Sequence, residues 1–167
     1  MKNLIFVGGP MGVGKTTVCR ALQPMLPNCV LLDGDWCWDA HPFVVTDETK
    51  TMVLENIAFL LQNFLRCSAY ENILFCWVLH EESISQNLLG RLDGLSFQLH
   101  RFSLVCNESM LRTRLEADIR SGTRTKDVIP RSLERLPLYQ ATNSLLLDTS
   151  FLTPHQVAHE MKSRILL

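Results

Sequence analysis

The sequence predicts an α/β fold built on a mainly parallel sheet, and two observations carry this prediction. Short apolar runs typical of strands alternate with helix-like runs along the whole chain, as in sheets whose crossover helices cover both faces. A glycine-rich segment at 9–16 lies between the first such strand and the first helix, with the spacing of a phosphate-binding loop. The 167 residues suffice for one domain with a sizeable core, so a single domain is expected over 1–167.

Five strands and six helices are expected, and most of their boundaries coincide with residues that start or stop a helix. Pro24 and Pro27 close the first helix, Asn107 can cap the fourth, Gly122 ends it, and Pro130 suits the first turn of the next. The expected strands cover about 3–7, 29–33, 73–79, 98–105 and 144–147, and the expected helices about 15–25, 47–68, 82–93, 108–121, 131–140 and 154–166.

The apolar pattern also predicts where the core lies. The run at 73–79 is apolar almost throughout, as expected of a central strand covered on both faces. The long helix carries a stripe at helical spacing that we expect to be core. Its members are Met52, Val53, Ile57, Leu60, Leu61, Phe64 and Leu65.

Composition and charge indicate which partners the protein binds and in which compartment it occurs. The chain is 47% hydrophobic and 20% charged with a net charge of −1, so no nucleic-acid or membrane partner is expected. No apolar run approaches the roughly 18 residues needed to cross a bilayer, and the N-terminal run is too short for a signal peptide. The six cysteines form no C-x-x-C pair, which favours reduced thiols in a cytoplasmic protein over a zinc site or a disulfide framework.

The segment at 9–16 has the spacing G-x-x-x-x-G-K-[ST] of a P-loop. Its glycines let backbone N–H groups approach a phosphate, with a helix N-terminus behind them. Lys15 adds a positive charge for the β and γ phosphates, and the Thr16 hydroxyl is a candidate Mg²⁺ ligand. The residues predicted to contact the nucleotide here are Gly9, Met11, Gly12, Val13, Gly14, Lys15, Thr16 and Thr17.

Two carboxylates follow the second strand, in the segment Asp33-Gly34-Asp35. Ligands of open parallel sheets bind beyond the C-terminal ends of the strands, so both side chains can reach the region of the γ-phosphate. One of them could hold Mg²⁺ through water, and the other could orient and deprotonate a substrate hydroxyl. The structural alternative is a solvated Asp-Gly turn.

An arginine-rich segment follows the fourth strand, and we expect a small lid at about 120–131. Arg120 and Arg124 flank Gly122 and are predicted to act on the transferred phosphoryl group, whose negative charge they would stabilise. Arg131 is predicted to contact the nucleotide, on a phosphate or by stacking on the base. The structural alternative is a solvated helix face with pairs such as Arg112–Glu116 and Arg114–Asp118.

Four further residues lie where an acceptor could be. His80 and Glu81 follow the third strand, in the place where many P-loop proteins have an Asp. Trp36 and Trp38 follow the Asp pair and could sandwich a ring-bearing acceptor. A structural histidine and a hydrophobic cover on the long helix are the competing interpretations.

These motifs together resemble the small P-loop kinases of the nucleoside-monophosphate-kinase-like group. Within that group the chain is similar to shikimate and gluconate kinases and to chloramphenicol phosphotransferase-like proteins, which have an acidic residue matching Asp35. The resemblance implies a three-layer α/β/α fold with a five-stranded parallel sheet of order 2-3-1-4-5, and ATP·Mg²⁺ as donor. It implies Asp35 as the base that activates the hydroxyl and Asp33 as a ligand of a Mg²⁺-bound water or of the substrate.

The sequence thus predicts an ATP-dependent phosphotransferase acting on a small hydroxyl-bearing molecule, as a monomer or homodimer. A nucleoside or nucleotide kinase is the alternative enzyme. A nucleotide-binding regulatory or resistance protein with low turnover is the alternative in which catalysis is not the main function. A GTP-dependent switch is disfavoured because Thr125-Lys126-Asp127 does not match the N-K-x-D guanine motif and no D-x-x-G follows the third strand.

Overall fold

The computed structural model describes residues 1–166 and contains one five-stranded sheet in which every strand pairs in parallel. The strand order is β2-β3-β1-β4-β5, as the resemblance implied. The strands are β1 (Lys2–Gly8), β2 (Cys29–Asp33), β3 (Asn72–Cys76), β4 (Phe97–Val105) and β5 (Leu145–Asp148).

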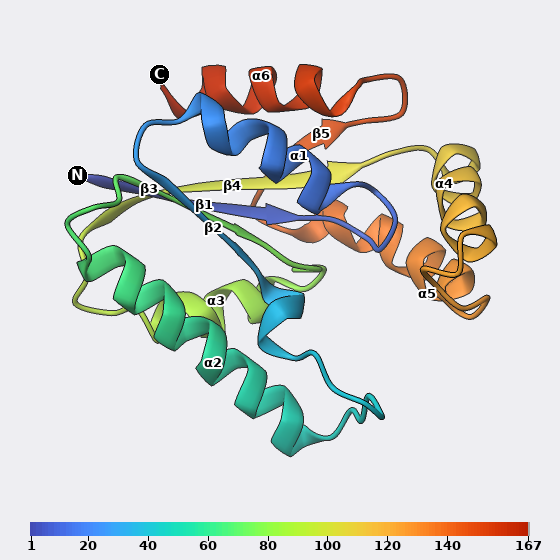
Figure 1. Ribbon diagram of the computed structural model, residues 1–167, viewed down its shortest axis with the longest axis horizontal. Coiled ribbons are helices and arrows are strands. Elements are labelled where there is room, and N and C mark those ends of the chain that lie inside the picture. The colour runs from blue at the N-terminus through green and yellow to red at the C-terminus, as the bar shows by residue number, and fades with distance from the viewer. Residues whose placement is uncertain (167) are drawn as a thin grey trace.

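Helices cover both faces of the sheet and one end of it (Figure 1). Helices α1 and α6 lie on one face, α2 and α3 on the other, and α4 and α5 lie beyond the C-terminal ends of β1 and β4. The α-helices are α1 (Lys15–Leu22), α2 (Asp47–Arg66), α3 (Glu82–Gly90), α4 (Glu108–Arg120), α5 (Val128–Arg135) and α6 (Pro154–Ile165). Three short 3₁₀ helices join them, η1 (Gln23–Met25), η2 (Gly34–Cys37) and η3 (Leu136–Ala141).

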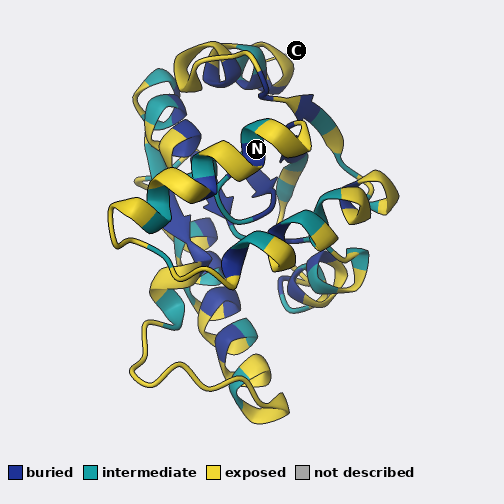
Figure 2. Ribbon diagram, turned by 90° about the vertical axis from the view of Figure 1, so that its right-hand side faces the viewer, coloured by how far each residue is buried: buried dark blue, intermediate teal, exposed yellow. Residues whose placement is uncertain are grey.

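The sheet separates two apolar clusters because side chains of a strand alternate between its faces. In β1, Ile5 and Val7 pack toward α1 and α6, whereas Leu4 and Phe6 pack toward α2 and α3. Figure 2 shows the result, with helices buried on their inner sides and exposed on their outer sides. Both faces of β1, the middle strand of the sheet, are therefore apolar, which explains why its sequence shows no polar alternation.

Local sequence signals account for most helix ends. The Asn107 side chain accepts a hydrogen bond from the backbone N–H of Met110 at the start of α4, as expected. Thr46 and Thr153 each form a capping box at the starts of α2 and α6.

Three expectations about the elements were wrong in detail. β3 ends at Cys76 rather than at residue 79, because the next residues leave the sheet beside the P-loop. α5 covers Val128–Arg135, so it starts before the expected helix at about 131–140. Met52 is exposed rather than core, whereas the adjacent Val53 is buried, because successive residues of a helix point in directions about 100° apart.

The six cysteines are free thiols, of which Cys19, Cys76 and Cys106 are buried. Over residues 1–166, no helix is both long enough and apolar enough to cross a membrane.

Candidate active site

The candidate site lies where β1, β2 and β3 end, because the C-terminal ends of parallel strands meet at one edge of the sheet. The P-loop leaves β1 at Gly8 and leads into α1. Gly12 has a φ of 83°, and a Cβ there would lie 2.4 Å from the Leu115 side chain of α4. Only glycine combines this left-handed conformation with such a close approach, so the loop is fixed against α4.

Lys15 starts α1 and folds back over the loop. Its Nζ donates to the carbonyl oxygens of Gly9 at 2.8 Å and Pro10 at 3.0 Å. Burial lowers the pKa of Lys15, and the Asp35 carboxylate opposes this effect. The Lys15 ammonium is thus inside the loop, where a phosphate cradled by the loop's N–H groups would meet it.

Asp33 and Thr16 meet directly across the end of the sheet. The Thr16 hydroxyl donates to Asp33 Oδ2 at 2.6 Å, and the other carboxylate oxygen accepts from the Asp35 N–H at 3.1 Å. Asp33 is 6% exposed. A hydroxyl and a carboxylate are oxygen donors of the kind that Mg²⁺ prefers, so the pair fits a magnesium site that would be completed by phosphate and water.

Asp35 is exposed and is oriented by a residue that sequence reasoning missed. The indole Nε1 of Trp77 donates to Asp35 Oδ1 at 3.1 Å, and the second carboxylate oxygen has no hydrogen-bond partner among residues 1–166. Trp77 also packs over Gly34, where a Cβ would come within 2.5 Å of the indole ring. A hydrophobic residue directly after β3 gives no sequence signal for such a polar contact.

Arg114 of α4 binds the backbone of the P-loop, a contact that the sequence did not predict. Its guanidinium donates to the carbonyl oxygen of Val13 at 3.0 Å, and to Thr149 Oγ1 at 3.1 Å and Thr149 O at 2.8 Å. The Arg114–Asp118 pair of the structural alternative is absent from residues 1–166, because Asp118 binds Arg124 instead. Arg114 therefore fastens the P-loop to α4 and to the segment after β5.

Arg114→Ala is expected to lower the free energy of unfolding by about 1–3 kcal/mol, since three hydrogen bonds of a charged group are lost. It should also weaken ATP binding, because the backbone of Val13 loses its anchor. Chemical denaturation and calorimetric titration measure the two effects. Arg112→Ala, an exposed arginine of the same helix, is the control and should stay within about 0.5 kcal/mol of the wild type. Equal ATP affinity of the Arg114 variant would contradict the anchoring role.

The expected lid at 120–131 faces the P-loop across a pocket of about 290 Å³. Met11 lines the pocket on the P-loop side, and Arg124 and Arg131 line it on the lid side. Arg124 Nε donates to Asp118 Oδ2 at 3.1 Å, and Arg131 Nη2 donates to Asp127 Oδ2 at 2.6 Å. Arg124 also lowers the pKa of Lys15, although less than burial does, so the two cations act on one region.

Arg120 is apart from these groups in this conformation. It is exposed in the last turn of α4 and does not line the pocket that Arg124 shares with the P-loop. Of the lid arginines expected from the sequence, the structure thus brings Arg124 and Arg131 to the P-loop and leaves Arg120 at the rim.

The segment after β3 runs alongside the P-loop with an unusual backbone. The carbonyl oxygen of Val78 accepts from the N–H of Gly9 at 3.2 Å and from the hydroxyl of Tyr139 at 2.6 Å. Leu79 has a φ of 43°, a left-handed conformation rare for a branched side chain. The next residue, His80, has a buried Nδ1 without a hydrogen-bond partner among the described residues.

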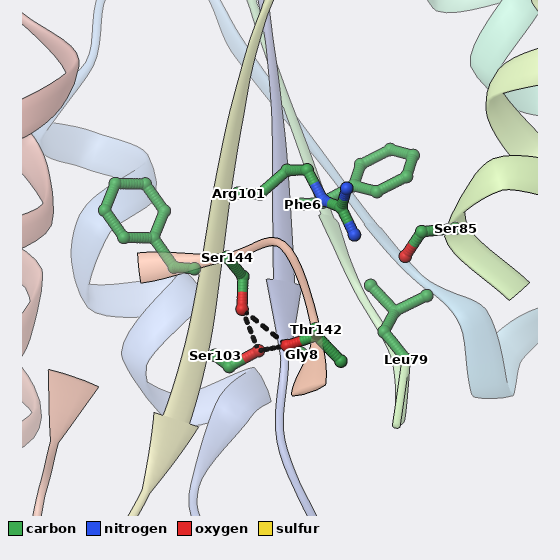
Figure 3. A pocket seen from close by; sticks show the side chains of 9 residues that line it. Phe6, Gly8, Leu79, Ser85, Arg101, Ser103, Thr142 and Ser144 are labelled. Carbon is green, nitrogen blue, oxygen red and sulfur yellow. Dashed lines mark hydrogen bonds between the residues drawn. The ribbon is translucent and has the colours of Figure 1, made fainter. Parts of the chain in front are cut away.

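A second, smaller cavity lies behind Gly8 and is shown in Figure 3. Three hydroxyl groups gather in it, with the Ser144 oxygen 2.6 Å from that of Ser103 and 2.8 Å from that of Thr142. Its volume is about 10 Å³, which is room for roughly one water molecule. This cavity is therefore too small for an acceptor.

The two tryptophans of η2 and its C-cap differ in their surroundings. Trp36 is 52% exposed, and the Arg20 guanidinium lies 5.8 Å from its ring centroid on the α1 side. Trp38 is half-buried against the α2 and α3 cluster and lies 4.6 Å from the ring centroid of Phe43. Trp38 thus lies on the side of Asp35 that faces α2, whereas Trp36 faces α1.

Known proteins resemble this arrangement in sequence and in structure. A family model described as an AAA domain matches residues 5–132. No match is found among curated proteins. The tunicamycin resistance protein of Deinococcus radiodurans superposes with a TM-score of 0.75 at 23% identity, over 100% of this chain and 97% of that one.

Two solved kinases share the fold as well. A gluconokinase from Sinorhizobium meliloti has a TM-score of 0.70 at 19% identity, covering 98% of this chain and 91% of that one. The shikimate kinase of Acinetobacter baumannii, solved with shikimate, has a TM-score of 0.65 at 20% identity, covering 99% and 93%. The fold of this chain is that of the small P-loop kinases. Because the family model extends from β1 into α5 and includes the P-loop, the chain belongs to the AAA domain family of P-loop proteins.

Proposed function

We propose that the protein transfers the γ-phosphate of ATP to a hydroxyl group of a small molecule. The observation that carries the proposal is the convergence of a P-loop lysine, a Thr16–Asp33 pair and an exposed, oriented Asp35 at one edge of the sheet. Phosphoryl transfer requires little more than positioning and charge stabilisation, which these groups supply. The family and the kinase neighbours support a small-molecule phosphotransferase.

Each residue has a proposed role. The P-loop N–H groups and Lys15 bind the β and γ phosphates, and Thr16 and Asp33 hold Mg²⁺, which neutralises charge on the phosphates when bound. Asp35 accepts the proton of the acceptor hydroxyl with its free oxygen while Trp77 fixes the other. Arg124, and Arg120 after closure of the lid, stabilise the transferred group, and Arg131 contacts the nucleotide.

The present ion-pair partners of the lid arginines indicate how the lid would close on a nucleotide. Arg124 and Arg131 are each bound to an aspartate of their own segment, at distances of 3.1 and 2.6 Å. A polyphosphate in the 290 Å³ pocket would compete with Asp118 and Asp127 for these guanidinium groups. The proposed closure of the lid is this exchange of carboxylate for phosphate.

The test is transfer of radiolabelled γ-phosphate from ATP to a panel of hydroxyl compounds with magnesium present. We expect a labelled product with at least one acceptor and none when magnesium is chelated. Labelled inorganic phosphate as the sole product would favour a nucleotide-binding protein without an acceptor, and transfer confined to nucleosides would favour the nucleoside kinase alternative.

A further inference from the structure

The short segment after β3, residues 77–79, contacts both the acceptor side and the donor side of the candidate site. On one side the Trp77 indole donates to Asp35 Oδ1 at 3.1 Å. On the other side the carbonyl oxygen of Val78 accepts from the N–H of Gly9, the first glycine of the P-loop motif, at 3.2 Å. Two adjacent residues thus join the proposed base to the loop that would hold the phosphates.

Tyr139 holds this segment from a third direction. It lies in η3, which continues α5 without a break, and its hydroxyl donates to the same Val78 carbonyl oxygen at 2.6 Å. The residue is fully buried, and a Cβ on Gly8 would lie 3.6 Å from its ring. Tyr139 therefore packs at the point where β1 becomes the P-loop.

The hydroxyl of Tyr139 remains a hydrogen-bond donor at neutral pH. Burial raises the pKa of Tyr139, and Arg135 and the backbone of Gly9 lower it to a smaller extent. A phenol whose pKa is raised keeps its proton throughout the neutral range, so the contact with Val78 does not depend on pH there. The effect of the Gly9 backbone also places this hydroxyl beside the P-loop.

The Tyr139 hydroxyl is the only group of α5 or η3 that forms a hydrogen bond with residues 77–79 in the described part of the chain. His80 Nδ1 and Ser132 Oγ of α5 are buried, and neither has a partner among the described residues. Leu79 has a φ of 43°, which a branched side chain keeps only where its surroundings impose it. The polar contact from Tyr139 contributes to that constraint.

We propose that Tyr139 is a positioning residue for phosphoryl transfer, which acts by fixing the Val78 carbonyl between the P-loop and Asp35. This proposal rests on the proposed function. In-line attack requires the acceptor oxygen, held at Asp35, to meet the γ-phosphate, held by the P-loop, at one separation and angle. Small errors in this geometry slow such a reaction strongly. Because Tyr139 is buried and contacts neither substrate, it acts on the rate of transfer rather than on affinity.

Tyr139→Phe removes one oxygen atom and keeps the aromatic ring. We expect single-turnover transfer to slow by about tenfold, as for one lost hydrogen bond, while the acceptor KM and the affinity for ATP·Mg²⁺ change by less than about twofold. Tyr70→Phe is the matched control, since Tyr70 is the other tyrosine of the chain and packs edge-on against Phe64. It precedes β3 at the end of the sheet opposite the P-loop, so its variant should match the wild type.

Two signals in the spectrum of nitrogen-15-labelled protein report the geometry without turnover. The chain has three tryptophans and hence three indole signals, and Trp77→Phe identifies that of Trp77. In Tyr139→Phe this signal should shift, and the Gly9 amide should exchange with solvent about fivefold faster, because the Val78 carbonyl loses one of its two donors. In the wild type the Gly9 amide should be protected from exchange, and this measurement stands even if Tyr139→Phe does not fold.

A combined variant distinguishes positioning from a general loss of stability. If Tyr139 acts through the segment that carries Trp77, the variant with both Trp77→Phe and Tyr139→Phe should lose less rate than the product of the two single losses. Rate losses that multiply in full would mean that the two residues act independently, which contradicts the proposal.

Three further results would overturn it. They are a Tyr139→Phe variant that transfers phosphate at the wild-type rate, a Gly9 amide that exchanges freely in the wild type, and a Tyr70→Phe variant that is slowed equally. Failure of the proposed function is separate from these. It shows as absent transfer by the wild type, while the Gly9 and Trp77 signals still report whether Tyr139 fixes the segment.

Discussion

Asp35→Asn is expected to slow phosphoryl transfer by about 10²- to 10⁴-fold, while the affinity for ATP·Mg²⁺ stays near that of the wild type. The amide keeps the size of the carboxylate and can still accept from the Trp77 indole, so the local geometry is preserved. What it loses is the basic oxygen that takes the acceptor's proton. Single-turnover transfer of labelled γ-phosphate measures the rate, and calorimetry measures ATP binding.

Asp39→Asn is the matched control, because Asp39 is exposed four residues further along the same segment. It should transfer phosphate at close to the wild-type rate. Asp33→Asn should behave differently from both, since Asp33 bonds to the Thr16 hydroxyl, and its main effect should be on the magnesium concentration required. Transfer by Asp35→Asn at the wild-type rate would remove Asp35 as the base.

Lys15→Ala is expected to weaken ATP·Mg²⁺ binding by about tenfold to a hundredfold, as expected when a charged hydrogen-bond donor is lost. It should lower the rate of transfer by a further factor of about 10²–10³, because the ammonium acts on charge that develops during the reaction. The fold should persist, since the two hydrogen bonds join Lys15 to carbonyl oxygens of its own loop and connect no two elements of the sheet. Calorimetric titration and single-turnover kinetics separate the two effects.

Lys50→Ala provides the control for loss of one positive charge. Lys50 is on the surface of α2, where its ion pair with Asp47 contributes little to stability. This variant should bind ATP like the wild type, and circular dichroism checks the fold of both variants. Equal ATP affinity of Lys15→Ala and the wild type would remove the P-loop from the proposed mechanism.

The sequence by itself determined the sheet, its helices and the phosphate-binding loop. These features depend on local chemistry, namely apolar runs bounded by Pro24, Asn107 and Gly122, and the glycine-lysine-threonine spacing of the loop. The strand order followed from the family resemblance rather than from any pattern, because pairing between distant strands leaves little local trace. The position of Asp33 and Asp35 beside the P-loop followed from the rule that parallel strands end at one edge.

Only the tertiary structure decided which polar groups of that edge meet. Trp77 was part of an apolar run and gave no sign that its indole would orient Asp35, since a tryptophan in such a run is equally suited to pure core packing. Arg114 had an acidic residue four positions away, which satisfied the local rule for helix pairs. In the folded chain Arg114 donates to the carbonyl oxygen of Val13, and Asp118 pairs with Arg124. These contacts stabilise the fold more than a surface ion pair between Arg114 and Asp118 would.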